Sequence, residues 1–323
     1  MFTFLSTRIK KGIAICISIG LGLVFIYSGY TKLVPVIETF EFTFIDIGIA
    51  NWYTAPVMAR LLIGLEFFIG LLLLFNYHLK KFTIPLTVSI LLFFILYLIG
   101  QLIFSGNTVN CGCFGEHHRM SPLQAIIKNV IMIVGSLLVY FFYEGWKVKF
   151  NSLLLSVIGL TVCTLPFIIN PIDYHYSSNN MDEKINYRLD LDLLYHPEDS
   201  AKVEIPKVEL RKGKQVLAFL SLTCSHCRIA AKKFRLIKKQ NSALPIYFIL
   251  NGDKENYSPF INDTKADNIP SSYCLGKTFI QLASSQLPRI YYLENSMVVK
   301  KVDYFELNQY DIENWLTNTS IKK

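Results

Sequence analysis

Two hydrophobic patterns divide the chain: long unbroken apolar runs fill its first half, and shorter apolar stretches separated by polar segments fill its second half. A helix needs about 20 apolar residues to cross the core of a bilayer. The runs that approach or exceed this length are residues 12–31, 55–76, 83–104, 122–143 and 151–170. The first could also be a cleaved signal peptide, but it is long for one and no small-residue cleavage site follows it. We therefore predict an all-α membrane domain of about five transmembrane helices over residues 1–170.

The second half has the pattern of an α/β domain. After a polar stretch at 171–202, which we predict to be a linker, "KQVLAFLSL" is typical of a buried strand and "RIAAKKFRLIKKQ" of a helix. The stretch "LPIYFIL" predicts a second strand, and "LPRIYYLENSMVVKKVDY" predicts two strands around a turn at Glu294 and Asn295. A last helix is expected in "DIENWLTN". Residues 203–323 are thus predicted to form a separate soluble domain.

Composition and charge agree with this division. Hydrophobic residues make up 52% of the chain, too large a share for an ordinary soluble protein. Residues 1–170 carry 11 Lys and Arg and 6 Asp and Glu, whereas residues 171–323 carry 21 and 18. Basic residues of the second half are interleaved with acidic ones and form no stripe with aromatic residues. We expect the lipid bilayer to be a partner of the first half, and no nucleic acid partner.

The positions of Lys and Arg predict the orientation of the helices, because cytoplasmic loops of membrane proteins carry an excess of these residues. With a cytoplasmic N-terminus, the short outer loops hold only Lys32 and Arg119. The cytoplasmic segments then hold seven such residues: Arg8, Lys10, Lys11, Lys80, Lys81, Lys147 and Lys149. An odd number of spans places the second domain on the outer side of the membrane. We therefore predict a bacterial inner-membrane protein whose soluble domain lies in the oxidising periplasm.

Cys224 and Cys227 form a C-x-x-C pair where the first predicted strand meets the first predicted helix of the soluble domain. A thiolate at a helix N-terminus is stabilised by unpaired N–H groups and by the helix dipole, which predicts that Cys224 is the more acidic thiol. His226 would add to that stabilisation. The alternative, a structural zinc site, needs a second C-x-x-C or an H-x-H, which this domain lacks.

The order of strand, C-x-x-C, helix, strand and hairpin resembles the thioredoxin fold over about residues 203–318. The resemblance implies that Cys224 is the exposed nucleophile and Cys227 the buried resolving thiol. It also implies that Leu287–Pro288 is a cis peptide at which substrate docks. The residues between the cysteines are Ser-His where thioredoxin has Gly-Pro, so the resemblance does not imply a redox potential.

A second cysteine pair, Cys111 and Cys113, lies between the third and fourth apolar runs. A disulfide across a single glycine closes a very small ring and would be strained, and strained disulfides are the labile, oxidising ones. Together with His117 and His118 the two cysteines could instead bind a metal, but C-x-C is tighter than the usual zinc spacing. We expect a redox pair here and no metal.

Polar and charged residues inside membrane spans are costly and usually functional. Arg60, Gln101 and Lys128 lie within about 10 Å of the predicted outer ends of their helices, at about 1.5 Å per residue. Arg60 and Lys128 are candidates for stabilising a thiolate or a reduced quinone oxygen, although long side chains near a helix end also extend to the interface. Gln101 is a further candidate for quinone binding. Glu66, near mid-membrane, is expected to face the interior of the bundle.

Two motifs, "YSGYTKL" at the end of the first run and "NCGCFG" before the fourth, together resemble the MauE and DoxX-like families of small redox-associated membrane proteins over about residues 8–145. The resemblance implies a helical bundle comparable with the quinone-linked disulfide oxidases.

These features together predict an enzyme, an inner-membrane thiol-disulfide oxidoreductase. Electrons would pass between cysteines of exported proteins, the C-x-x-C pair, the C-x-C pair and a quinone. Net oxidation of exported thiols is expected, because the remaining membrane cysteines, Cys16 and Cys163, lie on different helices and at different depths and cannot carry electrons from the cytosol. Reduction or isomerisation is the alternative direction. The alternative function is a non-catalytic assembly factor, in which a membrane anchor carries a thioredoxin-like binding module and the C-x-C pair is structural or metal-bound.

Overall fold

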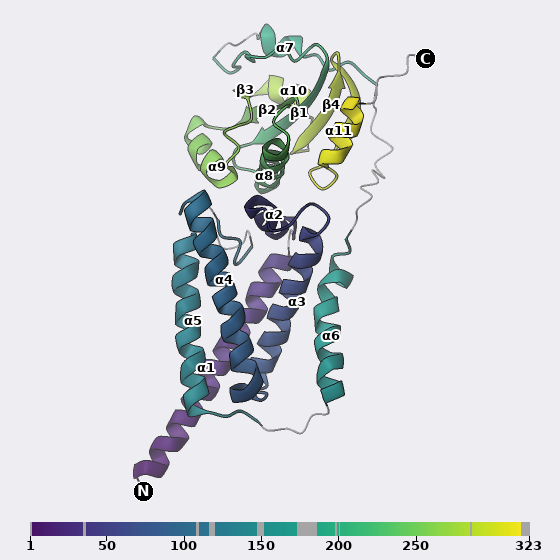
Figure 1. Cartoon of the computed structure of the whole chain (residues 1–323). Helices are drawn as coiled ribbons and strands as arrows, with labels where there is room; N and C mark the ends of the chain where they lie inside the picture. Colours follow the sequence, from purple (N-terminus) through teal and green to yellow (C-terminus); the bar gives the residue numbers. More distant parts are fainter. Residues whose placement is uncertain are drawn as a thin grey trace. The chain divides into compact units, whose positions relative to one another are not determined.

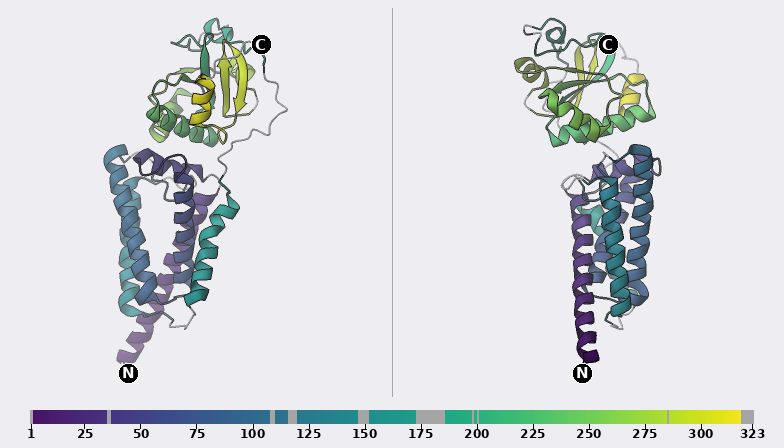
Figure 2. Two further views of the ribbon diagram at one scale, coloured as in Figure 1. Left: turned by 45° about the vertical axis from the view of Figure 1, so that its right-hand side comes forward. Right: turned by 90° about the vertical axis from the view of Figure 1, so that its left-hand side faces the viewer.

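The structure is a computed structural model that describes residues 2–34, 37–107, 110–115, 120–146, 152–172, 186–197, 199, 201–284 and 286–317. The chain divides into two compact units, Met1–Ile172 and Asp173–Lys323, whose ribbons are drawn in Figures 1 and 2. Each unit has a hydrophobic core of its own.

Helices make up the described part of the first unit. They are α1 (Phe2–Leu33), α2 (Glu38–Ile47), α3 (Ala55–Leu74), the short π-helix η1 (Leu79–Thr83), α4 (Ile84–Ser105), α5 (Pro122–Phe142) and α6 (Ser152–Ile169). Among the described residues, four helical stretches are long and apolar enough to cross a membrane, and α6 contributes a shorter apolar stretch. With 18 residues, α6 is about 27 Å long at about 1.5 Å per residue, and it packs against α3. All five predicted apolar runs are therefore helical, and the fifth is the shortest.

The membrane unit places apolar side chains outward and polar ones inward. Phe104 and Phe141 are 81% and 72% exposed, as expected of side chains that face lipid. Lys32, Arg60 and Glu66 are buried inside the bundle. Charged groups inside a membrane bundle are stable only when they pair with one another or line a cavity, so these three residues direct attention to the bundle interior.

Helix α2 was not predicted. It is only 10 residues long, too short to span a bilayer, and it packs against α3 and α4. Its buried aromatic residues Phe40, Phe42 and Phe44 hold it against the bundle.

The soluble unit contains a five-stranded sheet in the order β3-β2-β1-β4-β5. Its strands are β1 (Lys214–Ser221), β2 (Ile246–Asn251), β3 (Ser271–Tyr273), β4 (Arg289–Glu294) and β5 (Met297–Val302). Strand β1 pairs parallel with β2 and antiparallel with β4. The longer helices of this unit are α8 (Ser225–Gln240), α9 (Tyr257–Thr264), α10 (Lys277–Ala283) and α11 (Gln309–Thr317). This topology confirms the predicted thioredoxin-like α/β domain, including its hairpin and terminal helix.

The predicted linker is in part a packed segment. Residues 171–202 were expected to lie outside the soluble domain, yet Leu189, Leu191 and Leu194 are buried in its core. Leu194 belongs to the short helix α7 (Asp192–Tyr195). The reason is that the apolar residues of this otherwise polar stretch supply enough buried surface to hold it against the domain.

Candidate functional site

The C-x-x-C pair lies where β1 ends and α8 begins. Cys224 is the N-cap residue of α8, and Cys227 is buried in its first turn. The Ser221 N–H donates a hydrogen bond to Cys227 Sγ at 3.3 Å. A hydrogen bond from Cys227 lowers the pKa of Cys224 to about 5, and the N–H groups of Cys227 and His226 and the charge of His226 act in the same direction. The same hydrogen bond, together with burial, raises the pKa of the Cys227 thiol.

The Leu287–Pro288 peptide is cis, which confirms the predicted conformation. Pro288 immediately precedes β4, whose first residue, Arg289, is paired with Phe219 near the end of β1. The cis peptide and Cys224 therefore lie at the same end of the sheet. The His226 ring stacks on Tyr304 with centroids 5.3 Å apart and an interplanar angle of 22°.

The C-x-C pair lies in the connection between α4 and α5, which we call the CGC loop (residues 110–115). Cys111 is buried and Cys113 is partly buried. The Cys113 N–H donates to Cys111 Sγ at 3.3 Å. Gly115 has a φ of +57°, and a Cβ on it would lie 2.1 Å from the Thr31 carbonyl oxygen at the end of α1. Only glycine fits this approach, so the last residue of the "NCGCFG" motif holds the CGC loop against α1.

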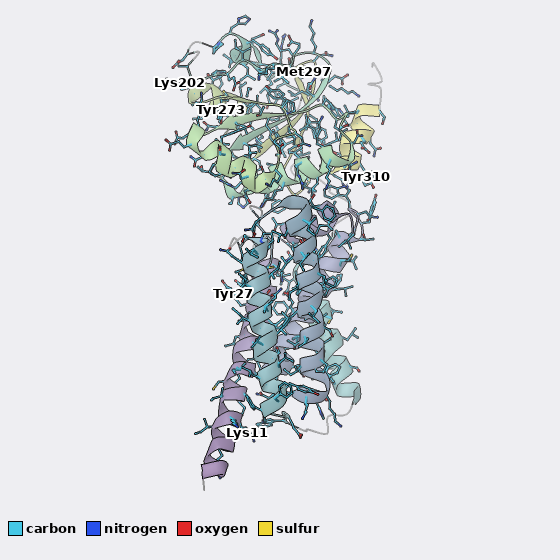
Figure 3. The ribbon with its side chains drawn as sticks, turned by 60° about the vertical axis from the view of Figure 1, so that its left-hand side comes forward. Lys11, Tyr27, Lys202, Tyr273, Met297 and Tyr310 are labelled. Carbon is cyan, nitrogen blue, oxygen red and sulfur yellow. The ribbon has the colours of Figure 1, made fainter. Side chains whose placement is uncertain are left out.

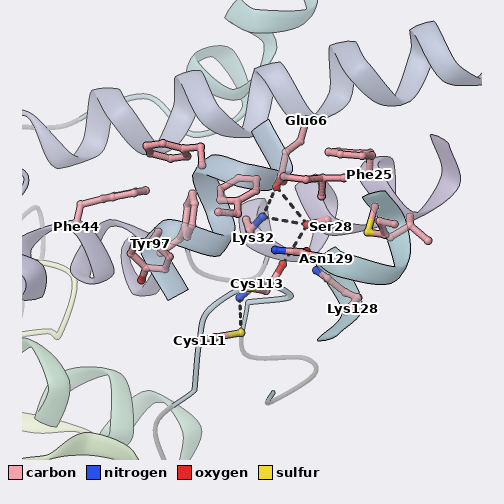
Figure 4. A pocket seen from close by; sticks show the side chains of 16 residues that line it. Phe25, Ser28, Lys32, Phe44, Glu66, Tyr97, Cys111, Cys113, Lys128 and Asn129 are labelled. Carbon is pink, nitrogen blue, oxygen red and sulfur yellow. Dashed lines mark hydrogen bonds and ion pairs between the residues drawn. The ribbon is translucent and has the colours of Figure 1, made fainter. Parts of the chain in front are cut away.

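An ion pair lies inside the bundle beside the CGC loop (Figure 4). Lys32 Nζ is 2.5 Å from Glu66 Oε1, and both side chains are about 3% exposed. Lys32 also donates to Ser28 Oγ at 3.0 Å, and Ser28 Oγ donates to the Cys113 carbonyl oxygen at 3.1 Å. The polar chain from Glu66 through Lys32 and Ser28 thus ends on the CGC loop.

A narrow cavity of about 30 Å³ lies within this cluster. Its polar and thiol-bearing lining comes from Ser28, Lys32, Glu66, Tyr97, Cys111, Cys113, Lys128 and Asn129. Lys128 Nζ lies 4.4 Å from the centroid of the Phe114 ring. These residues come from α1, α3, α4, α5 and the CGC loop, and α2 adds Phe40 and Phe44, so the cavity lies where five helices and the loop meet.

Three of the four predicted membrane site residues lie at the cavity or beside the CGC loop. Glu66 faces the bundle interior, as predicted, and Lys128 lines the cavity beside both cysteines. Gln101 is buried next to the CGC loop, with its Nε2 at 3.5 Å from the Asn110 carbonyl oxygen. These three residues therefore lie at the cavity or beside the CGC loop, and their functional roles stay predictions.

Arg60 does not line this cavity, and its predicted role beside a thiolate or quinone stays a prediction. Its guanidinium forms an ion pair with Glu41 of α2 at 2.7 Å. Its Nε donates to the carbonyl oxygen of Asn170, just after α6, at 2.7 Å. Arg60 therefore joins α2, α3 and the end of α6, and it is not a residue that lines the cavity.

Lys32, Ser28 and Asn129 were missed in the sequence. Lys32 was assigned to an outer loop, but it lies in the last turn of α1 and is buried. The signal was present in "YSGYTKL", because Ser28 and Lys32 are four residues apart and hence on one face of the helix. Two polar residues on one face of an apolar helix indicate a polar partner inside the bundle.

Among the described residues, no group of three or more His, Cys, Asp or Glu side chains could hold a metal ion. His117 and His118, the other candidate ligands for a metal at the CGC loop, lie outside the described residues.

The comparisons with known proteins cover both units. Residues 10–142 match the family model of methylamine utilisation protein MauE. The chain is 32% identical over 296 residues to protein TlpB of Flavobacterium psychrophilum, across 78% of this chain and 80% of that protein.

Similar solved structures include the thioredoxin domain of a thiol-disulfide oxidoreductase from Bacteroides vulgatus, at 14% identity over 33% of this chain and 81% of that one, with a TM-score of 0.28. A thioredoxin-like protein from Bacteroides caccae is also 14% identical, over 82% of this chain and 81% of that one, with a TM-score of 0.25.

Proposed function

The chain belongs to the family of protein TlpB, and we propose that it is a membrane-bound thiol-disulfide oxidoreductase. The observation that carries this proposal is the opposite ionisation of the two thiols at the start of α8. Cys224 has a lowered pKa of about 5, whereas the pKa of buried Cys227 is raised. At neutral pH the Cys224 sulfur is thus a thiolate and a nucleophile, whereas Cys227 is a protonated thiol.

The chemistry of this pair is thiol-disulfide exchange. In the oxidising direction, a substrate thiolate attacks the Cys224 sulfur of the Cys224–Cys227 disulfide, and Cys227 leaves as a thiolate that takes up a proton. A second substrate thiolate then attacks the substrate sulfur of the mixed disulfide and releases Cys224. The substrate loses two electrons, and the C-x-x-C pair gains them.

We propose that the C-x-C pair is the second redox centre and accepts these electrons. A hydrogen bond with Cys111, and the positive charges of Lys128 and Lys32, lower the pKa of Cys113. The same hydrogen bond and burial raise the pKa of Cys111. This asymmetry matches that of the C-x-x-C pair and supports the same kind of chemistry.

A quinone is our proposed final acceptor, because it is a lipid-soluble oxidant of two electrons. The cavity of about 30 Å³ has room for water and is too small for a quinone ring. The groups that would hold a quinone are therefore those toward the bundle surface, where Phe114 packs against Tyr27 with ring centroids 5.7 Å apart. Tyr27, labelled in Figure 3, is 44% exposed. Lys128, over the Phe114 ring, would supply a positive charge there.

The location and direction that we propose follow from this acceptor. The soluble domain would face the periplasm of a bacterial inner membrane, with the N-terminus in the cytoplasm and exported cysteine-containing proteins as substrates. Net oxidation of these proteins is proposed, since Cys16 and Cys163 lie on α1 and α6 and offer no second pair on one helix. Reduction or isomerisation would need electrons from another membrane protein.

Replacing Cys227 tests the exchange chemistry. A Cys227→Ser variant of the full-length protein should accumulate mixed disulfides through Cys224, including some to Cys111 or Cys113, because the resolving thiol is absent. Non-reducing gels and mass spectrometry would identify the partners. Cys274→Ser, which removes a buried thiol elsewhere in the soluble domain, should accumulate none. Finding Cys224 always free in Cys227→Ser would exclude the proposed chemistry.

A further inference from the structure

Among the described residues, three buried polar atoms of the cavity beside the CGC loop have unused hydrogen-bonding capacity: the Tyr97 hydroxyl oxygen and one atom each of Glu66 and Asn129. Within the described part of the chain, Glu66 Oε2 and Asn129 Nδ2 have no hydrogen-bond partner, although both side chains line the cavity. One is an acceptor and the other a donor. Buried polar groups are nearly always satisfied, and a cavity of about 30 Å³ exceeds the roughly 10–15 Å³ that a water molecule needs. A water between these atoms would satisfy both.

The charges around this cavity keep the free-energy cost of a proton transfer inside it low. The cavity is lined by the ammonium groups of Lys32 and Lys128, the carboxylate of Glu66, the Tyr97 hydroxyl and the thiols of the CGC loop, whereas α2 contributes the apolar rings of Phe40 and Phe44. Moving a proton from a thiol to the carboxylate exchanges one anion for another and leaves the net charge unchanged. The cost of placing an additional charge in a low-dielectric interior is therefore avoided.

Lys32 is positioned to stabilise the anion in either place. Its ammonium contacts Glu66 directly, and its positive charge lowers the pKa of the Cys113 thiol. It also donates to Ser28, which donates to the Cys113 carbonyl oxygen. When a proton moves from Cys113 to Glu66, the Cys113 thiolate replaces the Glu66 carboxylate as the anion in the cavity. Lys32 therefore has an anion in the same cavity before and after the transfer.

We propose that Glu66 is the proton store of the CGC centre and exchanges a proton with Cys113 through a water molecule in this cavity. This inference rests on the proposed function, because it requires Cys111 and Cys113 to form a reversible disulfide. When a dithiol reduces that disulfide, the S–S bond breaks and two electrons and two protons enter the site, while the dithiol becomes a disulfide. One proton forms the Cys111 thiol, the second is held by Glu66, and Cys113 remains a thiolate. Oxidation releases both electrons and both protons.

Infrared difference spectra of the full-length protein in lipid nanodiscs test this assignment. The protein would carry Cys224→Ser and Cys227→Ser, so that among the two redox pairs only Cys111 and Cys113 change on reduction by dithiothreitol. We expect the reduced-minus-oxidised spectrum to show one protonated carboxylic acid per disulfide reduced, with a band that shifts in D₂O, and the S–H stretch of one thiol.

Two acidic residues provide the variant and its matched control. Glu66→Gln should lose the carboxylic acid band. Glu41→Gln should keep it, because Glu41 is also a buried carboxylate in an ion pair but does not line the cavity. If Glu66→Gln does not fold, the S–H bands and the carboxylic acid band of the parent protein still show whether the second proton is on a carboxylic acid or on sulfur.

Two results would overturn the proposal. Two S–H bands without a carboxylic acid band would place both protons on sulfur, and a carboxylic acid band that survives in Glu66→Gln would belong to another residue. The redox role of the C-x-C pair is tested in the same spectra: if dithiothreitol produces no difference spectrum at all, Cys111 and Cys113 are not a redox pair, and the proposal for Glu66 fails with that role. The exchange chemistry of Cys224 and Cys227 is tested separately, by Cys227→Ser.

Discussion

Replacing Cys227 with alanine tests what makes Cys224 acidic. The hydrogen bond from Cys227 is the largest cause of the lowered pKa of Cys224, ahead of the N–H groups of Cys227 and His226. With a pKa of about 5, Cys224 is about 99% thiolate at pH 7, whereas a thiol with a pKa of about 9 is about 1% thiolate. The ionisation of Cys224 is thus the property on which its role as nucleophile depends.

The expected size of the effect follows from the strength of that hydrogen bond. A hydrogen bond to a charged group contributes about 1.5–3 kcal/mol, and one pKa unit corresponds to about 1.36 kcal/mol. Cys227→Ala should therefore raise the pKa of Cys224 by about one to two units. Because the pKa rises, the thiolate fraction falls between about pH 5 and pH 7 and is nearly unchanged above about pH 8.

The assay is the rate at which iodoacetamide alkylates Cys224, measured from about pH 4 to pH 9 by mass spectrometry of the reduced full-length protein. Cys274 is an internal control, because burial raises its pKa to about 12 and it should stay unmodified while the domain is folded. A midpoint near pH 9 in the unmodified protein, or the same midpoint in Cys227→Ala, would refute the reasoning.

Two further predictions concern the membrane unit. Lys32→Met should destabilise this unit by about 3–5 kcal/mol, since it leaves Glu66 as an unpaired buried charge. In thermal unfolding, the double variant Lys32→Met/Glu66→Leu should recover much of that loss of stability. An equal loss of stability in both variants would argue against the ion pair. Gly115→Ala should displace the CGC loop, because its Cβ would clash with the Thr31 carbonyl oxygen, and should speed alkylation of both loop cysteines. Gly20→Ala is the control and should not change alkylation, because Gly20 has open space around it. Unchanged alkylation in Gly115→Ala would show that the loop does not need this close approach.

The soluble site could be predicted from the sequence because its signals are local. The strand, the C-x-x-C pair and the helix that follows are contiguous, so the position of Cys224 at the helix N-terminus follows from the order of residues alone. Glu66 was likewise predictable, since a carboxylate near mid-membrane can only face the interior.

Long-range pairing explains what could not be predicted. Arg60 was assigned to the redox site from its depth, but its partners Glu41 and Asn170 lie 19 and 110 residues away in sequence. Lys32 was counted as a loop charge because an apolar run does not show where its helix ends. In a membrane bundle the depth of a residue can be estimated from sequence, whereas the helix that it faces depends on packing between distant segments.

The central claim, that electrons pass from Cys224 and Cys227 through Cys111 and Cys113 to an acceptor linked to respiration, is tested most directly by trapping the redox state of these four cysteines in living cells. In respiring cells we predict that both pairs are disulfides, that both become reduced when respiration is blocked, and that Cys111→Ala leaves the C-x-x-C pair reduced throughout. Cys16→Ala, which removes an exposed cysteine of α1, should behave like the unmodified protein. A C-x-x-C pair that is mostly reduced in respiring cells and becomes more oxidised in Cys111→Ala would contradict the account, because electrons would then flow outward through the C-x-C pair.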